Sequence, residues 1–324
     1  MKQIVKRALK IVRQLWTGER NLKIFLLEAQ RWHGSVLFYR LTNYRPYTRR
    51  GIPMTLDSYP YVAGMSFRNR CHLIYDEFQK DDASKITEED QVIFIKTDLI
   101  SEFFSTVMPH IQFRANIVTH NSDTDFSTQF TPYLEHEKVS KWYAINVAFL
   151  HPKLHSIPIG LAEKKWVHGD TDKIKAAIAT KWDKRYTAYV NFNANNCPEE
   201  REKVVSLFSN TDWVFTSKRV PFSQYLKDLR RCKYAISPRG VGMDCHRIWE
   251  SILLGTIPIV KDCPFISHYR DLPILIVEKW EDVTEQLLNH HYESILSRKD
   301  LSRLYMDYWI KEIGLLEIYE SCAR

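Results

Sequence analysis

The sequence has no run of about 18 apolar residues, the length that a helix needs to cross the hydrocarbon core of a bilayer. Its N-terminus also lacks the uninterrupted apolar centre of a secretory signal peptide. Both absences argue against a membrane-spanning or exported protein, so we expect a cytoplasmic one. The six cysteines include no Cys-x-x-Cys pair, so neither a zinc site nor a disulfide framework is indicated, and reduced thiols are expected.

Lysine and arginine outnumber aspartate and glutamate by 46 to 39, which gives a net charge of +7. This charge suits acidic partners such as nucleotide phosphates or lipid head groups. It is spread along the chain, however, and does not gather into the basic and aromatic blocks typical of nucleic-acid binding. We therefore expect no nucleic-acid partner.

Residues 2–16 combine apolar and basic side chains at helical spacing. The apolar positions are Ile4, Val5, Leu9, Val12 and Trp16, and lysines and arginines fill the other faces. This pattern is typical of a helix on an anionic membrane surface, which would make the protein peripheral on the inner face of a membrane. The alternative is a helix packed on its own domain with a solvated basic face, and the pattern does not separate the two.

Helical and strand-like segments alternate twice along the chain, between about 90 and 160 and again from about 186 onward. Such alternation implies parallel βαβ units, and 324 residues are enough for two cores. We predict an α/β protein with two Rossmann-like domains facing a cleft, covering residues 1–165 and 166–324. The segment 301–320 has a broad apolar face and is predicted to be a helix that packs across the two domains.

The stretch AISPRGVGMDCHRIWESILLGTIPIV, residues 235–260, joins two apolar runs through a glycine-rich turn and a helix. The first run predicts a strand that stops at Pro238, and Gly240 and Gly242 then let the backbone come close to a ligand. We expect a helix to start near Asp244, which can serve as its N-cap. Unpaired N–H groups and the positive end of the helix dipole at such a start form a site for an anion.

Charged side chains surround this predicted helix start. Arg239, His246 and Arg247 add charge or hydrogen-bond donors, which suits a phosphate or diphosphate. Glu250 lies on the same helical face as Arg247, where its carboxylate can accept the hydroxyls of a ribose. Phosphate and ribose indicate a nucleotide; the structural alternative is a turn and a helix stabilised by an Arg247–Glu250 ion pair. The predicted nucleotide-binding residues are Ser237, Arg239, Gly240, Gly242, His246, Arg247 and Glu250.

The residues ISPRGVGMDCHRIWE and LGTIPIV resemble the C-terminal signature of the exostosin-like (GT47-type) glycosyltransferases, inverting enzymes with the two-Rossmann GT-B fold. Looser similarity extends over about residues 185–290. The resemblance implies a nucleotide-sugar donor, in particular a UDP-sugar, with Arg239 and Arg247 on its diphosphate and Glu250 on its ribose. It also implies a glycan or lipid-linked glycan acceptor. The chain is short and lacks the anchor of the Golgi members, which points to a bacterial or viral relative.

The loop THNSDTDFS follows an apolar strand of the first half and offers candidates for the base of an inverting transfer. Asp123 is the first choice and His120 the second, although Asn-Ser-Asp clusters are also ordinary turn residues. Asp123 and Asp125 also match the Asp-x-Asp motif that holds Mn²⁺ in GT-A enzymes. Because arginines already serve the diphosphate, we expect a reaction without a metal ion or other cofactor.

Further polar or glycine residues end strands on the predicted cleft side and are candidate substrate contacts, with turn residues as the structural alternative. They are Asp98, Gly160, Asn193, Asn195 and Arg201. Other functions remain open from the sequence: a GDP-fucose-type transferase, which shares the helix and Gly-x-x-Pro strand, a nucleotide-sugar epimerase, or a non-catalytic nucleotide- or glycan-binding module.

Overall fold

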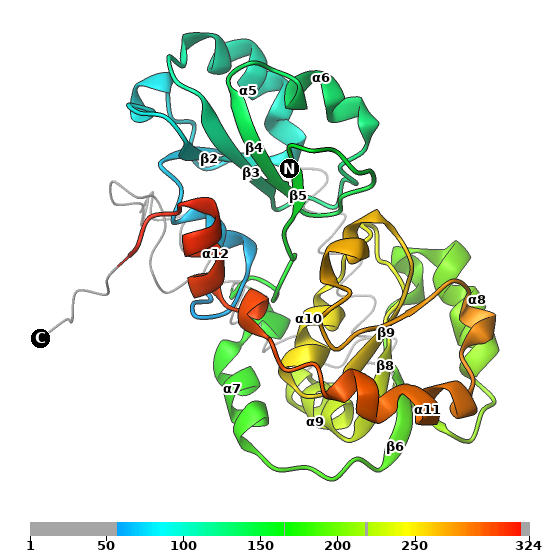
Figure 1. The fold of residues 1–324 in the computed structure, drawn as a ribbon. Helices are drawn as coiled ribbons and strands as arrows, with labels where there is room; N and C mark the ends of the chain where they lie inside the picture. Colours follow the sequence, from blue (N-terminus) through cyan, green and yellow to red (C-terminus); the bar gives the residue numbers. More distant parts are fainter. Residues whose placement is uncertain (1–56, 165, 218–219, 319–324) are drawn as a thin grey trace, which may run out of the picture.

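The computed structural model describes residues 57–164, 166–217 and 220–318 (Figure 1). Residues 2–16, for which a membrane-surface helix is predicted, lie outside these ranges. Within them, no helix combines the length and the apolar character that crossing a bilayer requires.

The N-terminal half is built on a five-stranded parallel sheet whose strands lie side by side in sequence order. The central strands are buried runs of apolar residues, as expected for a parallel sheet covered on both faces. The strands are β1 (Leu73–Tyr75), β2 (Gln91–Lys96), β3 (Ala115–His120), β4 (Val139–Ala144) and β5 (Leu154–Ser156). The helices of this half are α4 (Gly64–Arg68), α5 (Ile100–Thr106) and α6 (Thr131–Leu134).

The C-terminal half contains a second five-stranded parallel sheet, with the order β10-β9-β8-β6-β7. Its strands are β6 (Tyr186–Val190), β7 (Val214–Thr216), β8 (Cys232–Ile236), β9 (Ile257–Lys261) and β10 (Leu275–Val277). Its helices are α7 (Thr171–Ala179), α8 (Pro198–Phe208), α9 (Phe222–Arg230), α10 (His246–Leu253) and α11 (Glu285–Leu296), with a 3-10 segment η9 (Pro264–Tyr269). The two sheets confirm the predicted α/β fold with two Rossmann-like halves.

The order of the second sheet reverses between β6 and β8. From β6 the chain moves outward to β7, and it then returns to β8 on the other side of β6. Loops that leave neighbouring strands in opposite directions open a crevice at the carboxyl ends of these strands, and α/β proteins bind ligands at such switch points. The loops after β6 and β8 are therefore where a site is expected.

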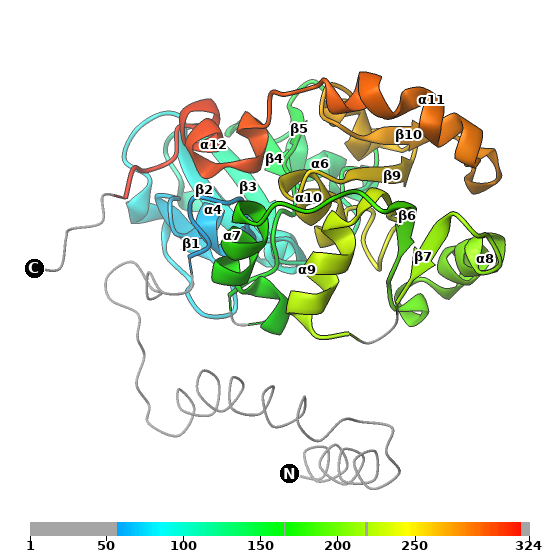
Figure 2. The same cartoon turned by 90° about the horizontal axis from the view of Figure 1, so that it is seen from below.

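The last helix, α12 (Met306–Ile313), returns to the N-terminal half after the whole C-terminal sheet has been completed (Figures 1 and 2). Met306 and Trp309 are buried in one cluster with Phe67 and Phe94 of the N-terminal half. Gly314 ends the helix in the left-handed conformation, with φ of 79°, which glycine adopts without strain. The final helix is thus present as predicted, and its buried side chains pack on the N-terminal half after the chain has crossed from the C-terminal sheet.

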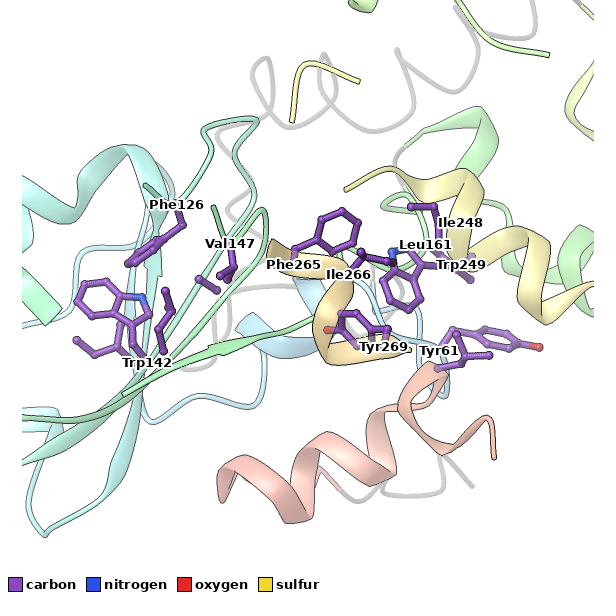
Figure 3. Packing of buried hydrophobic residues seen from close by; sticks show 14 of the residues in the cluster. Tyr61, Phe126, Trp142, Val147, Leu161, Ile248, Trp249, Phe265, Ile266 and Tyr269 are labelled. Carbon is purple, nitrogen blue, oxygen red and sulfur yellow. The ribbon is translucent and has the colours of Figure 1, made fainter. Parts of the chain in front are cut away.

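One buried cluster continues from the N-terminal half into the C-terminal half (Figure 3). Leu161 follows β5, whereas Trp249 lies on α10 and Tyr269 in η9, and all three side chains are buried there. The Trp249 and Tyr269 rings meet edge to face at 5.0 Å, and the Tyr269 hydroxyl donates to the carbonyl of Ser156 over 2.9 Å. The two halves therefore share an apolar core next to the switch point.

Candidate functional site

The loop between β8 and α10, residues 237–245, lies at the switch point and faces the N-terminal half. A Cβ on Gly242 would come within 2.6 Å of Nδ2 of Asn146, which follows β4, so only glycine lets the loop approach this closely. A Cβ on Gly240 would be 3.4 Å from its nearest neighbour, an Arg201 nitrogen, so space does not require glycine there. Ser237 begins the loop as a buried residue whose N–H donates to the Ile259 carbonyl over 2.9 Å.

Arg201 holds this loop in place from the first turn of α8. Its guanidinium donates to the carbonyls of Arg239 at 2.7 Å, Asn193 at 2.8 Å and Pro238 at 3.4 Å. The side chain is 4% exposed, so Arg201 fixes the loops after β6 and β8 relative to each other instead of facing a ligand. Arg201 therefore positions the two loops. The sequence alone, which offers Arg201 as a candidate substrate contact, does not indicate this role.

The β8–α10 loop binds a carboxylate from the other half. Arg239 Nη2 donates to Oδ2 of Asp125 over 2.9 Å, and the backbone N–H of Met243 donates to Oδ1 over 3.1 Å. A cationic side chain and a backbone N–H that hold both oxygens of a carboxylate form an anion site. The Asp125 carboxylate fills this anion site in the structure.

Asp244 is not the N-cap of α10, contrary to the prediction; that position belongs to Cys245, which makes no side-chain cap. The Asp244 carboxylate instead accepts from the backbone N–H of Ile159 at 2.7 Å and from Nε1 of Trp249 at 2.8 Å. Burial raises its pKa to about 7 against the effect of these hydrogen bonds. Asp244 therefore ties the start of α10 to the N-terminal half, a role that a search for helix caps in the sequence does not detect.

Arg247 and Glu250 lie in α10 but do not form an ion pair with each other within the described residues. Arg247 donates through Nη2 to the Asn191 carbonyl and lies over the Phe192 ring, 5.4 Å from its centroid. Its buried Nε has no hydrogen-bond partner in this part of the chain.

Glu250 is buried and accepts from the Tyr225 hydroxyl of α9 over 2.7 Å. Burial raises its pKa, while the Tyr225 hydroxyl and the Arg247 charge act in the opposite direction. Glu250 thus lies in α10 as predicted, but its carboxylate contacts α9. Nothing in the sequence indicated the contact with Tyr225.

The remaining predicted residues are distributed around the same loops. Asp123 is exposed in the loop after β3, while Asp98 accepts from Ser122 at 2.7 Å and from Thr124 at 3.3 Å and so stabilises that loop. Gly160, with φ of 65°, offers its carbonyl to His246. The predicted contacts Asn193 and Asn195 form a turn in which the Asn195 N–H donates to the Asn193 side chain over 3.2 Å.

A cavity of about 160 Å³ opens at the carboxyl ends of β8 and β9. This is below the 300–1,000 Å³ typical of small-molecule sites. Its lining includes Ser237, Arg239, Met243, Ile248, Lys261 and Asp262. A larger cavity of about 460 Å³ runs along β10 and α11 and lacks the loop residues described above. The smaller cavity is therefore the one that contains the charged side chains of the β8–α10 loop.

Two neutral histidines, His120 and His246, lie where the halves meet. Burial lowers the pKa of each to about 4. Since free imidazoles take up a proton near pH 6.5, the unfolded chain binds more protons than the folded one between pH 6.5 and 4. The free energy of unfolding should therefore fall as the pH drops through this range, by up to about 3 kcal/mol for each ring.

Replacing His120 with glutamine removes one of these groups. We expect urea unfolding of His120→Gln to lose less stability than the wild type between pH 6.5 and 4.5. His290→Gln, at an exposed position of α11, is the control and should retain the wild-type dependence. Because Asp244 acts in the opposite direction, the comparison uses the difference between the variant and the wild type. An unchanged dependence in His120→Gln would show that this ring titrates normally.

A comparison with known protein families finds one model that matches part of the chain. Residues 197–313, roughly a third of the sequence, match the family model of the RXYLT1 C-terminal domain, an exostosin-related glycosyltransferase domain. The match begins at Cys197 and includes the whole β8–α10 loop. No curated protein matches the chain.

Several solved structures are distantly similar. The pneumococcal O-GlcNAc transferase GtfA, in complex with UDP and GlcNAc, is 12% identical with a TM-score of 0.31; the alignment covers 69% of this chain and 54% of that one. A GtfA/B complex is 13% identical with a TM-score of 0.31, covering 71% and 55%. The UDP-GlcNAc 2-epimerase of Methanocaldococcus jannaschii is 10% identical with a TM-score of 0.30, covering 66% and 71%. The chain spans about half the length of the first two, and likenesses this low identify neither donor nor acceptor.

Proposed function

We infer that this protein is a glycosyltransferase, and we propose that it binds a nucleotide-sugar donor at the β8–α10 loop. The observation that carries the proposal is the anion site formed by Arg239 and the Met243 N–H, which Asp125 fills in this structure. The site lies at the switch point of the C-terminal sheet and at the start of α10, where a diphosphate is favoured. The match of residues 197–313 to an exostosin-related glycosyltransferase domain supports the same function.

In the proposed reaction, an acceptor hydroxyl attacks the anomeric carbon of the sugar from the side opposite the nucleotide, with inversion. Negative charge develops on the leaving diphosphate, and positive groups already in place lower the barrier. Arg239, the Met243 N–H and the start of α10 supply this charge stabilisation, and Arg247 Nε is a further donor within one turn. We propose that this suffices without a metal ion and that the donor is a UDP-sugar, with a glycan or lipid-linked glycan as acceptor.

The direct test is calorimetric binding of UDP, GDP and CMP to the full chain, with and without EDTA, followed by turnover of the matching nucleotide-sugars. Binding of UDP that EDTA does not change, together with sugar transfer to a glycoside, is the expected result. Binding that requires a divalent ion would overturn metal independence. Donor turnover that needs no acceptor would indicate an epimerase, and binding of no nucleotide would remove the proposed site.

Replacing Asp125 with asparagine is expected to strengthen nucleotide binding about tenfold. The variant keeps the shape of the side chain but removes the charge that competes with a phosphate for Arg239. Asp123→Asn is the matched control, because Asp123 is an exposed carboxylate of the same loop, and its affinity for UDP should match that of the wild type. Weaker binding in Asp125→Asn would mean that Asp125 assists the donor, for example by holding a metal ion as in the alternative Asp-x-Asp interpretation.

A further inference from the structure

Asn146 brings a side-chain amide from the N-terminal half against the β8–α10 loop. It lies two residues after β4, it is 1% exposed, and its φ of 54° places it in the left-handed region. Asparagine enters this region more readily than most residues, although only glycine does so without strain. Residues in such conformations concentrate at ligand-binding sites, so the contacts of this side chain are informative.

The orientation of the Asn146 amide follows from its contact with Asp244. The backbone N–H of Asp244 donates to Oδ1 over 2.8 Å, and because an N–H only donates, the atom that it meets is the amide oxygen. Nδ2 is then the atom nearest to a Cβ placed on Gly242, at 2.6 Å. Across residues 57–164, 166–217 and 220–318, this buried nitrogen has no hydrogen-bond partner. A buried donor without an acceptor is costly and needs an explanation.

Asn146 and Asp125 are neighbours on the same side of the β8–α10 loop. The N–H of Phe126, next to Asp125, donates to the Asn146 carbonyl over 2.8 Å. The two side chains accept from consecutive N–H groups of the loop, Asp125 from Met243 and Asn146 from Asp244. Both oxygens of the Asp125 carboxylate have a donor from the C-terminal half, and neither is bonded to Asn146 Nδ2. The carboxylate thus leaves one nearby donor unused.

We propose that Asn146 Nδ2 is a third donor of the anion site and binds a phosphate of the nucleotide-sugar once Asp125 is displaced. A diphosphate has more oxygens than a carboxylate, so Arg239, the Met243 N–H and Asn146 can each meet a separate oxygen. The nucleotide is then held by both halves of the protein and not by the C-terminal half alone. This inference rests on the proposed function and adds a ligand contact from the N-terminal half.

The test measures the affinity of two full-length variants for UDP by calorimetry. Asn146→Gly removes the amide and still accepts the positive φ. Asn146→Asp keeps an oxygen for the Asp244 N–H but replaces the Nδ2 donor with an acceptor. We expect UDP to bind Asn146→Gly about 10- to 100-fold more weakly, the factor that a lost hydrogen bond to a charged group implies. Binding to Asn146→Asp should be weakened at least as much.

Asn121→Gly is the matched control for these variants. Asn121 also has a positive φ, of 61°, and it follows β3, the strand next to β4. Its side chain contacts His120 Nδ1 and Met65 Sδ within the N-terminal half. The affinity of Asn121→Gly for UDP should therefore stay within about twofold of the wild-type value.

The pattern across the three variants decides the inference. Weaker UDP binding in both Asn146 variants, with wild-type binding in Asn121→Gly, supports a direct contact through Nδ2. A loss in Asn146→Gly alone would mean that the side chain only holds the Asp244 N–H, and a loss in Asn146→Asp alone would be an effect of the added charge. Either result would overturn the inference, as would wild-type affinity in both or an equal loss in Asn121→Gly. In these four cases a wild type that binds UDP keeps the proposed function, whereas a wild type that binds no nucleotide loses both.

Discussion

Replacing Arg239 with alanine is expected to weaken UDP binding about 100-fold, because a charge-assisted hydrogen bond to a phosphate contributes about 1.5–3 kcal/mol. The guanidinium holds an anion in this structure through Nη2 and lies partly exposed beside the cavity at the ends of β8 and β9. Arg239→Lys should recover only part of the affinity, since an ammonium group lacks the planar arrangement of donors. Isothermal calorimetry of the two variants measures both effects.

Arg231 provides the matched control for this experiment. It lies directly before β8, at the opposite end of the strand from Arg239, with its guanidinium over the Trp182 ring at 5.1 Å. Arg231→Ala should bind UDP with the wild-type affinity. If Arg239→Ala also keeps that affinity, the diphosphate is bound elsewhere and the assignment of the β8–α10 loop is wrong.

Replacing Arg201 with alanine should lower the free energy of unfolding by about 3 kcal/mol or more and remove most nucleotide binding. The change leaves the carbonyls of Asn193, Pro238 and Arg239 without their donor, and each lost buried hydrogen bond costs about 1–3 kcal/mol. The loops after β6 and β8 then lose their common support. Urea unfolding and calorimetry measure the two effects.

Arg201→Lys tests the geometry of this contact. A lysine keeps the charge but cannot direct several planar donors at three carbonyls, so it should recover less than half of the lost stability. Lys203→Ala on the same helix, where an exposed lysine pairs with Glu281, is the control and should cost little. A stable Arg201→Ala variant with normal UDP affinity would contradict the positioning role.

The sequence predicted the fold well because strong local patterns determine it. Buried runs of β-branched residues alternate with helices, and turn residues follow these runs where the parallel strands end. The β8–α10 loop was predicted for the same reason, since Pro238 and Gly242 interrupt the apolar run within a few residues. Whether Arg239 and Arg247 bind a diphosphate, and whether Glu250 binds a ribose, stay predictions.

The contacts between the halves could not be predicted. Asp125 and Arg239 are separated by 114 residues, and Asp244 accepts from Ile159 85 residues away. No periodicity or motif links such pairs, because their proximity depends on how two complete sheets meet. The burial of His120 could not be predicted either. The sequence places His120 in a polar loop, whereas in the structure it is the buried last residue of β3.

The return of α12 to the N-terminal half has a consequence for biosynthesis. Translation completes β1 to β5 early, but Met306 and Trp309, which cover Phe67 and Phe94, are among the last described residues to be made. At 5–20 residues per second, the ribosome needs on the order of 10 s to pass from β5 to α12. During this interval the nascent N-terminal sheet exposes an apolar face, so a chaperone that protects it would act before the chain is released.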